Sequence, residues 1–185
     1  MKLENSFEVE APPERAWDLL MDVPRVIPCM PGAELVETLN GDRWKAKMAV
    51  KLGPISLTFD TDVTREATDE QARRATLGAS ARETRGKGSA RATIESTLSE
   101  LEQGTRVDIV TDLALSGPVA VYGRGLIADV TNELVTSFAG CLQAQLEASP
   151  EEAQAAVAAQ AKPVSGFRVG LRALFRRVGR IFKRR

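Results

Sequence analysis

Few side chains in this chain could carry out acid–base or nucleophilic chemistry. The 185 residues include no histidine, which excludes Ser-His and Cys-His catalysis and histidine-based metal sites. The carboxylate pairs Asp60/Asp62 and Asp108/Asp112 occupy the polar positions of alternating, strand-like segments, where a solvated surface is the usual outcome. We therefore predict no catalytic residue and no metal site.

Cys29 and Cys141 are the only cysteines, and neither belongs to a CxxC motif. Such isolated cysteines indicate neither a zinc site nor a disulfide framework. We interpret both as reduced, small hydrophobic residues of a cytoplasmic protein. A reactive Cys29 is the alternative, but no histidine or nearby lysine is present to favour its thiolate.

The charges are segregated along the chain although the formal net charge is zero. Residues 162–185 carry nine basic and no acidic side chains, which leaves 16 basic against 25 acidic residues in 1–161. At 100° per residue the end of the chain predicts a helix with an apolar stripe opposite a basic face, as in helices that lie on an anionic membrane surface. The predicted membrane-binding residues are Phe167, Arg168, Leu171, Arg172, Leu174, Phe175, Arg176, Arg177, Val178, Arg180, Ile181, Phe182 and Lys183.

Other partners are possible for this basic segment. It could dock on a partner protein or on the acidic part of its own chain. Nucleic acid is disfavoured, because a phosphate-binding arm needs charge but no continuous stripe with three phenylalanines. The chain shows neither a signal peptide nor a run of about 18 apolar residues, so we expect a cytoplasmic protein, peripheral on the inner face of the cell membrane.

The elements that must position these residues belong to an α+β domain. Residues 3–10 end in a strand pattern, Pro13–Met21 predict a short amphipathic helix, and prolines break the following stretch. From 33 to 115 apolar residues recur at every second position, which predicts about six consecutive antiparallel strands. Apolar residues at three- and four-residue steps then predict a long helix over 118–147.

These elements predict a helix-grip fold, in which a curved antiparallel sheet of about seven strands wraps around a long C-terminal helix. The expected organisation is a domain over 1–147, an Ala/Gln-rich linker over 148–166 and a basic amphipathic helix over 167–185.

Several motifs, in this order along the chain, resemble the CoxG family of carbon monoxide dehydrogenase proteins, which belongs to the START-like, polyketide cyclase-related superfamily. The motifs are Pro12-Pro13-Glu14-Arg15-Ala16-Trp17, Cys29-Met30-Pro31-Gly32, Trp44 through Pro54, Gly104-Thr105-Arg106, and Gly117 through Ile127. The resemblance covers about 1–146 and implies a non-catalytic accessory protein of a molybdenum-containing carbon monoxide dehydrogenase. Pro118 and Phe138-Ala139-Gly140 depart from the family pattern, so we expect the ligand end of the pocket to differ.

Inward-facing positions of the predicted sheet combine large apolar side chains with the small residues Gly78, Ala79, Ala90 and Ala92. Small residues beneath a long helix leave volume for an apolar ligand, although a filled core is the alternative. The predicted ligand-binding residues are Met30, Trp44, Met48, Leu57, Phe59, Ala90, Ala92, Tyr122, Leu126, Val130 and Phe138. Tyr122, the only tyrosine, could donate its hydroxyl hydrogen to a ligand carbonyl.

An apolar pocket joined to a membrane-surface helix favours a carrier of a lipid-soluble molecule. With the resemblance, a respiratory quinone (menaquinone or ubiquinone) is the most economical cargo, with no covalently bound cofactor and with the dehydrogenase subunits as partners. A membrane recruiter or assembly factor without a ligand is the second hypothesis. A cyclase or hydrolase is the third, and the absence of histidine and of inward-facing acids disfavours it.

Overall fold

The computed structural model describes residues 1–52, 55–86, 88–117, 120 and 124–148. Its strands are β1 (Lys2–Val9), β2 (Ala33–Asn40), β3 (Arg43–Leu52), β4 (Ile55–Asp69), β5 (Arg74–Glu83), β6 (Ser89–Glu100) and β7 (Thr105–Ser116). Its helices are α1 (Pro13–Met21), α2 (Val23–Val26), the 3-10 turn η1 (Ile27–Cys29) and α3 (Arg124–Glu147).

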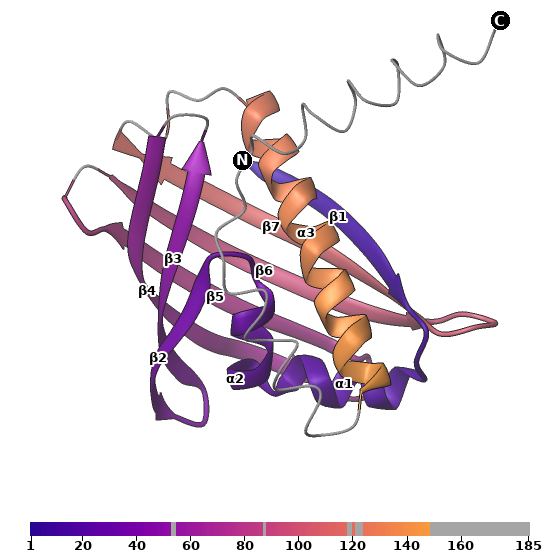
Figure 1. Cartoon of the computed structure of the whole chain (residues 1–185). Helices are drawn as coiled ribbons and strands as arrows, with labels where there is room; N and C mark the ends of the chain where they lie inside the picture. The colour runs from indigo at the N-terminus through magenta and orange to yellow at the C-terminus, as the bar shows by residue number, and fades with distance from the viewer. Residues whose placement is uncertain (53–54, 87, 118–119, 121–123, 149–185) are drawn as a thin grey trace, which may run out of the picture.

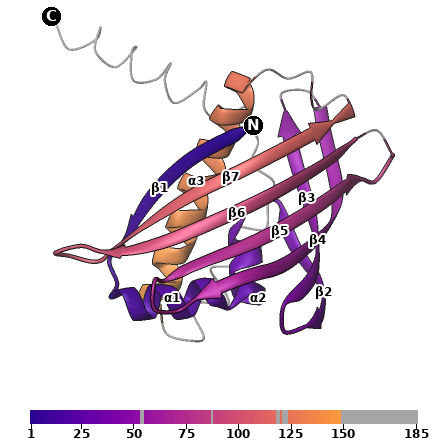
Figure 2. The ribbon, with the colours of Figure 1, turned by 180° about the vertical axis from the view of Figure 1, so that it is seen from behind.

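The seven strands form one antiparallel sheet in the order β1-β7-β6-β5-β4-β3-β2. Strands β2 to β7 follow one another as a meander, and β1 pairs with the last of them, β7. Helices α1 and α2 lie at one end of the sheet, and α3 crosses its concave face beside β1 (Figures 1 and 2). The predicted α+β helix-grip fold is therefore confirmed.

The main core lies where α3 packs on β1, β6, β7 and α1. The ring of Phe138 on α3 meets that of Phe7 on β1 edge to face, with centroids 5.9 Å apart. Val107 and Leu142 are almost fully buried in the same cluster. Burial of such side chains contributes about 1.5–3 kcal/mol each, so α3 is held mainly through its C-terminal half.

The Gly104-Thr105 motif holds the corner where β1 passes into α1. Gly104 has φ +98°, and a Cβ atom there would lie 2.2 Å from the carbonyl oxygen of Val9. The fully buried Thr105 donates its hydroxyl hydrogen to the carbonyl oxygen of Ala11 at 2.7 Å. This motif is thus explained by close backbone packing rather than by contact with a ligand.

The structure corrects two predictions about which residues face inward. Leu126 was expected on the buried stripe of the long helix, but it is 40% exposed and the adjacent Ile127 is the buried residue. Gly78 lies on the outer face, where an added Cβ would meet the side chain of Glu66. The predicted linker and tail helix, from residue 149 onward, lie outside the described residues.

Candidate functional site

A second apolar cluster lies on the concave face, separate from the main core. Phe59 is its buried centre. Around Phe59 pack side chains that are only partly buried, from three other strands, from β4 itself and from α3: Met48, Val50, Leu57, Ala81, Leu115 and Val130. We call these seven residues the Phe59 cluster. Because α3 leaves most of them partly exposed, they offer apolar surface to a ligand.

Strand alternation and register bring this cluster together. Met48 lies opposite Phe59, and Val50 lies opposite Leu57, so the inward positions of β3 and β4 form a wall of large side chains. On β5 and β6 the corresponding positions are small, with Ala81 opposite Ala90. The contrast of large and small side chains agrees with the pattern that we read from the sequence.

One inward position next to the cluster carries an acid. Glu83, at the end of β5, lies directly opposite Phe59 in the sheet register, and its side chain is on the same face. It is 4% exposed, and its Oε2 atom accepts a hydrogen bond from the backbone N–H of Arg85 at 2.9 Å. The expectation that inward-facing acids are absent is therefore wrong. The alternation from Ala75 through Ala81 to Glu83 is the signal that could have revealed this residue.

The structure does not gather all the predicted ligand residues in one place. Met48, Leu57, Phe59 and Val130 lie in the Phe59 cluster, and Ala90 lies beside it. Ala92 is partly buried on the same face of β6. Phe138 belongs to the main core, and Met30 packs against that core. Leu126 is exposed, and Tyr122 lies outside the described residues.

Trp44 has a different environment from the other predicted ligand residues. It is 2% exposed, and the guanidinium of Arg65 lies 5.3 Å from its ring centroid. Arg65 also donates a hydrogen bond to the carbonyl oxygen of Met21 at 2.6 Å. This stacked pair links the sheet to the end of α1, so Trp44 has a structural role whether or not it contacts a ligand.

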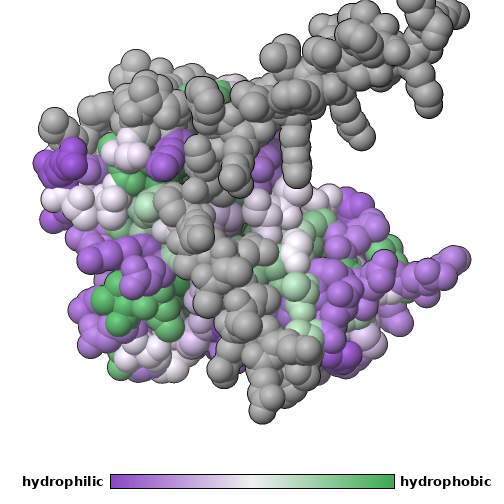
Figure 3. All heavy atoms as spheres, viewed as in Figure 1, coloured by the Kyte–Doolittle hydropathy of each residue, from purple (hydrophilic) through white to green (hydrophobic). Residues whose placement is uncertain are grey.

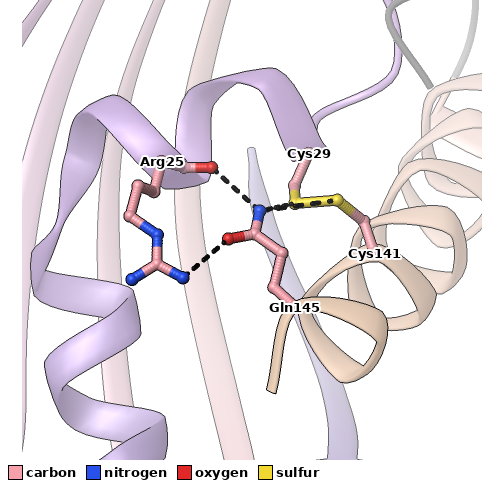
Figure 4. The surroundings of a disulfide bond; sticks show 4 residues. All are labelled: Arg25, Cys29, Cys141 and Gln145. Carbon is pink, nitrogen blue, oxygen red and sulfur yellow. Dashed lines mark hydrogen bonds between the residues drawn. A yellow bond between two sulfur atoms is a disulfide. The ribbon is translucent and has the colours of Figure 1, made fainter. Parts of the chain in front are cut away.

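The two cysteines form a disulfide, so the prediction of two reduced thiols is wrong. Cys29 in η1 and Cys141 in α3 have Cα atoms 5.4 Å apart, within the range of protein disulfides, and both are fully buried (Figure 4). The fold brings together residues 112 positions apart in the sequence. Disulfides are rare in cytosolic proteins, so the cysteines no longer support a cytoplasmic location.

A buried glutamine lies against this disulfide. The Nε2 atom of Gln145 is 3.0 Å from Sγ of Cys29 and also donates a hydrogen bond to the carbonyl oxygen of Arg25. The guanidinium of Arg25 in turn donates a hydrogen bond to Oε1 of Gln145 at 3.2 Å (Figure 4). Covalent and polar contacts together hold the α2–η1 segment on the C-terminal half of α3.

A hollow of about 660 Å³ lies over β3 to β7. Its charged lining residues, Lys45, Lys47, Asp60, Asp62, Arg82 and Arg91, alternate with the inward positions, which places them on the outer face of the sheet. The outward position predicted for Asp60 and Asp62 is thereby confirmed. A lining of this polarity does not suit an apolar ligand, so the Phe59 cluster is the better candidate site.

Apolar surface is otherwise sparse on the side of the molecule that α3 covers. Described apolar residues appear in the space-filling view as small areas among hydrophilic ones (Figure 3). Among the described residues, no helix is long and apolar enough to cross a membrane. The predicted membrane-binding residues, Phe167 to Lys183, lie outside the described part of the chain.

Comparison with solved structures defines the class of protein. The fold is similar to a conserved protein from Geobacillus kaustophilus, with a TM-score of 0.70 and 20% identity over 79% of this chain and 95% of that one. It is similar to a START superfamily protein from Mycobacterium smegmatis, with a TM-score of 0.54 and 16% identity over 79% and 97%. It is also similar to the Zhui aromatase/cyclase of Streptomyces sp. R1128, with a TM-score of 0.56 and 14% identity over 80% and 93%. The chain is a START-like helix-grip protein.

The family follows from the sequence of the same domain. The family model of CoxG, the G-type subunit of carbon monoxide dehydrogenase, matches residues 6–147, and the chain belongs to this family. No curated protein matches the chain significantly. Family membership associates the chain with carbon monoxide dehydrogenase and agrees with the resemblance in its sequence motifs.

Proposed function

We propose that this protein is a non-catalytic carrier that holds an apolar molecule, most economically a respiratory quinone, against the Phe59 cluster. The observation that carries the proposal is the partly exposed apolar cluster between α3 and strands β3 to β5. Each 100 Å² of apolar ligand surface removed from water would contribute about 2.5 kcal/mol. An isoprenoid chain, which offers little else, would be held in this way.

The family gives the carrier its partner. A carbon monoxide dehydrogenase has to pass the electrons from its substrate to an acceptor, and quinones are dissolved in the bilayer. A protein that presents an apolar site in water could deliver a quinone to the enzyme and return the reduced molecule. The proposed partners are thus the dehydrogenase subunits and the membrane, with no catalytic step on this chain.

The basic C-terminal segment would supply the contact with the membrane. Nine basic residues in 162–185 stand against an excess of nine acidic residues in 1–161. Near an anionic leaflet each basic residue contributes about 1 kcal/mol, and apolar side chains that enter the interface add to this. We place the protein at the inner face of the membrane on the strength of this segment, because the cysteines do not support that location.

Ligand recovery tests the carrier function. The full chain, purified from its native host with membranes present, is extracted with organic solvent and analysed by mass spectrometry. We expect a quinone in substoichiometric to equimolar amount. If no isoprenoid is recovered, and the protein takes up none from quinone-loaded vesicles, the carrier function is refuted and a recruiter without a ligand takes its place.

Vesicle sedimentation tests the membrane contact. Deletion of residues 163–185 should abolish sedimentation with anionic vesicles, and Leu174→Asp with Phe175→Asp should do nearly the same by placing charge in the apolar stripe. Val36→Asp with Leu39→Asp is the matched control, since these β2 side chains are 54% and 40% exposed and the change in charge is equal. Equal sedimentation of the truncated and full-length chains would refute the role of the tail.

A further inference from the structure

We propose that Glu83 binds the polar head of the ligand and selects a hydroxyl-bearing, reduced molecule over its oxidised carbonyl form. For a quinone this means a preference for the hydroquinone. The inference rests on the proposed function and specifies which redox form the site retains.

The position of Glu83 suits a head-group contact. It lies opposite Phe59, the centre of the apolar cluster, at the end of β5 that leads into the turn toward β6. Among the described residues it is the only acidic side chain that is buried. A long apolar ligand lying along the cluster with its head at this end of β5 would place its polar atoms beside a carboxylate.

The Glu83 carboxylate keeps capacity for a ligand beside its existing contacts. The backbone N–H of Arg85 donates to Oε2 at 2.9 Å, which holds the carboxylate in a defined position. A carboxylate has about four acceptor sites on its two oxygens. One more hydrogen bond from a ligand is therefore compatible with the contacts that the side chain already makes.

The chemistry of the acceptor decides which form binds. An ionised carboxylate only accepts hydrogen bonds, a hydroquinone hydroxyl donates one, and a quinone carbonyl only accepts. The hydroquinone therefore gains a charge-assisted hydrogen bond, whereas the quinone places an acceptor against an acceptor with no hydrogen between them. Hydrogen bonds to charged groups lead us to expect a preference of about tenfold or more for the hydroquinone.

Such a preference would give the carrier a direction. The hydroquinone is the quinone after addition of two electrons and two protons, which the dehydrogenase and water supply and this chain does not. A site that holds the reduced form more tightly would take it from the enzyme and keep its head group out of water until the bilayer receives it. The oxidised form would leave the site more readily.

The test measures both redox forms on the same protein. The full chain is dialysed to equilibrium against a short-chain naphthoquinone, and in a parallel anaerobic experiment against its hydroquinone, reduced beforehand by hydrogenation so that the disulfide is not exposed to a reductant. We expect the wild type to bind the hydroquinone about tenfold more tightly. Glu83→Gln should bring the two affinities within about threefold, because an amide both donates and accepts.

Two further variants keep the test decisive. Glu83→Asp retains an acceptor-only group and should retain the preference, so a loss of folding in one variant does not decide the outcome. Glu95→Gln, on the exposed outer face of β6, is the matched control and should behave as the wild type. Equal binding of both forms by the wild type, or an unchanged preference in Glu83→Gln, would overturn the role of Glu83 alone. Binding of neither form to the wild type would refute the proposed function and this assignment with it.

Discussion

Removal of the Cys29–Cys141 disulfide should destabilise the domain strongly. The bond closes a loop of 112 residues, and the entropy that such a loop removes from the unfolded chain corresponds to about 4.8 kcal/mol at 25 °C. Both sulfur atoms are fully buried, so a Cys29→Ser, Cys141→Ser variant also leaves two hydroxyl groups in an apolar site. We expect a loss of about 4–5 kcal/mol in the free energy of unfolding, a large part of the total for a domain of this size.

Urea unfolding followed by tryptophan fluorescence provides the measurement. The wild type is unfolded with and without a thiol reductant, with equilibration long enough for reduction of the buried bond. Reductant should lower the midpoint of the wild type and leave that of the double variant unchanged. Intact mass should show two fewer hydrogens in the wild type before reduction.

Two results would refute this reasoning. Free thiols in protein purified without reductant would show that the bond is absent from the native molecule. A wild-type midpoint that does not respond to verified reduction would show that the main core alone holds η1 on α3.

The two remaining predictions concern packing. Ala92→Phe, on the partly buried inner face of β6, should lower the recovered ligand several-fold and leave the melting temperature unchanged or higher, whereas a filled native core would lose roughly 1–3 kcal/mol by overpacking. Gly104→Ala should cost roughly 2 kcal/mol or more in the free energy of unfolding, because its φ is +98° and the new Cβ would lie 2.2 Å from the Val9 carbonyl oxygen. Gly41→Ala, where no atom lies within 4 Å of the added Cβ, is its control and should leave stability nearly unchanged.

The sequence alone determined the architecture of this protein, because local periodicity reports secondary structure directly. Alternation in β3 and β4 and the three- and four-residue steps of α3 sufficed for the strand count and for the helix-grip arrangement. The family motifs were equally readable, since Gly104-Thr105 serves a local backbone geometry that few other residues permit.

Facing within the elements was less predictable from sequence. Leu126 and Ile127 are adjacent apolar residues, and either could continue the stripe of α3 until packing selects one. Gly78 has no side chain to reveal its face, so only the register with β4 and β6 assigns it to the outer surface.

The contacts that give the candidate site its chemistry were decided by the tertiary structure. Cys29 and Cys141 carry no motif that announces a bond across 112 residues, and only the docking of η1 on α3 brings their Cα atoms to 5.4 Å. Glu83 reads as one more charged residue near a turn until the register sets it opposite Phe59 and burial removes it from water. Long-range pairing of this kind depends on how separate elements pack together, and no short stretch of sequence encodes that packing.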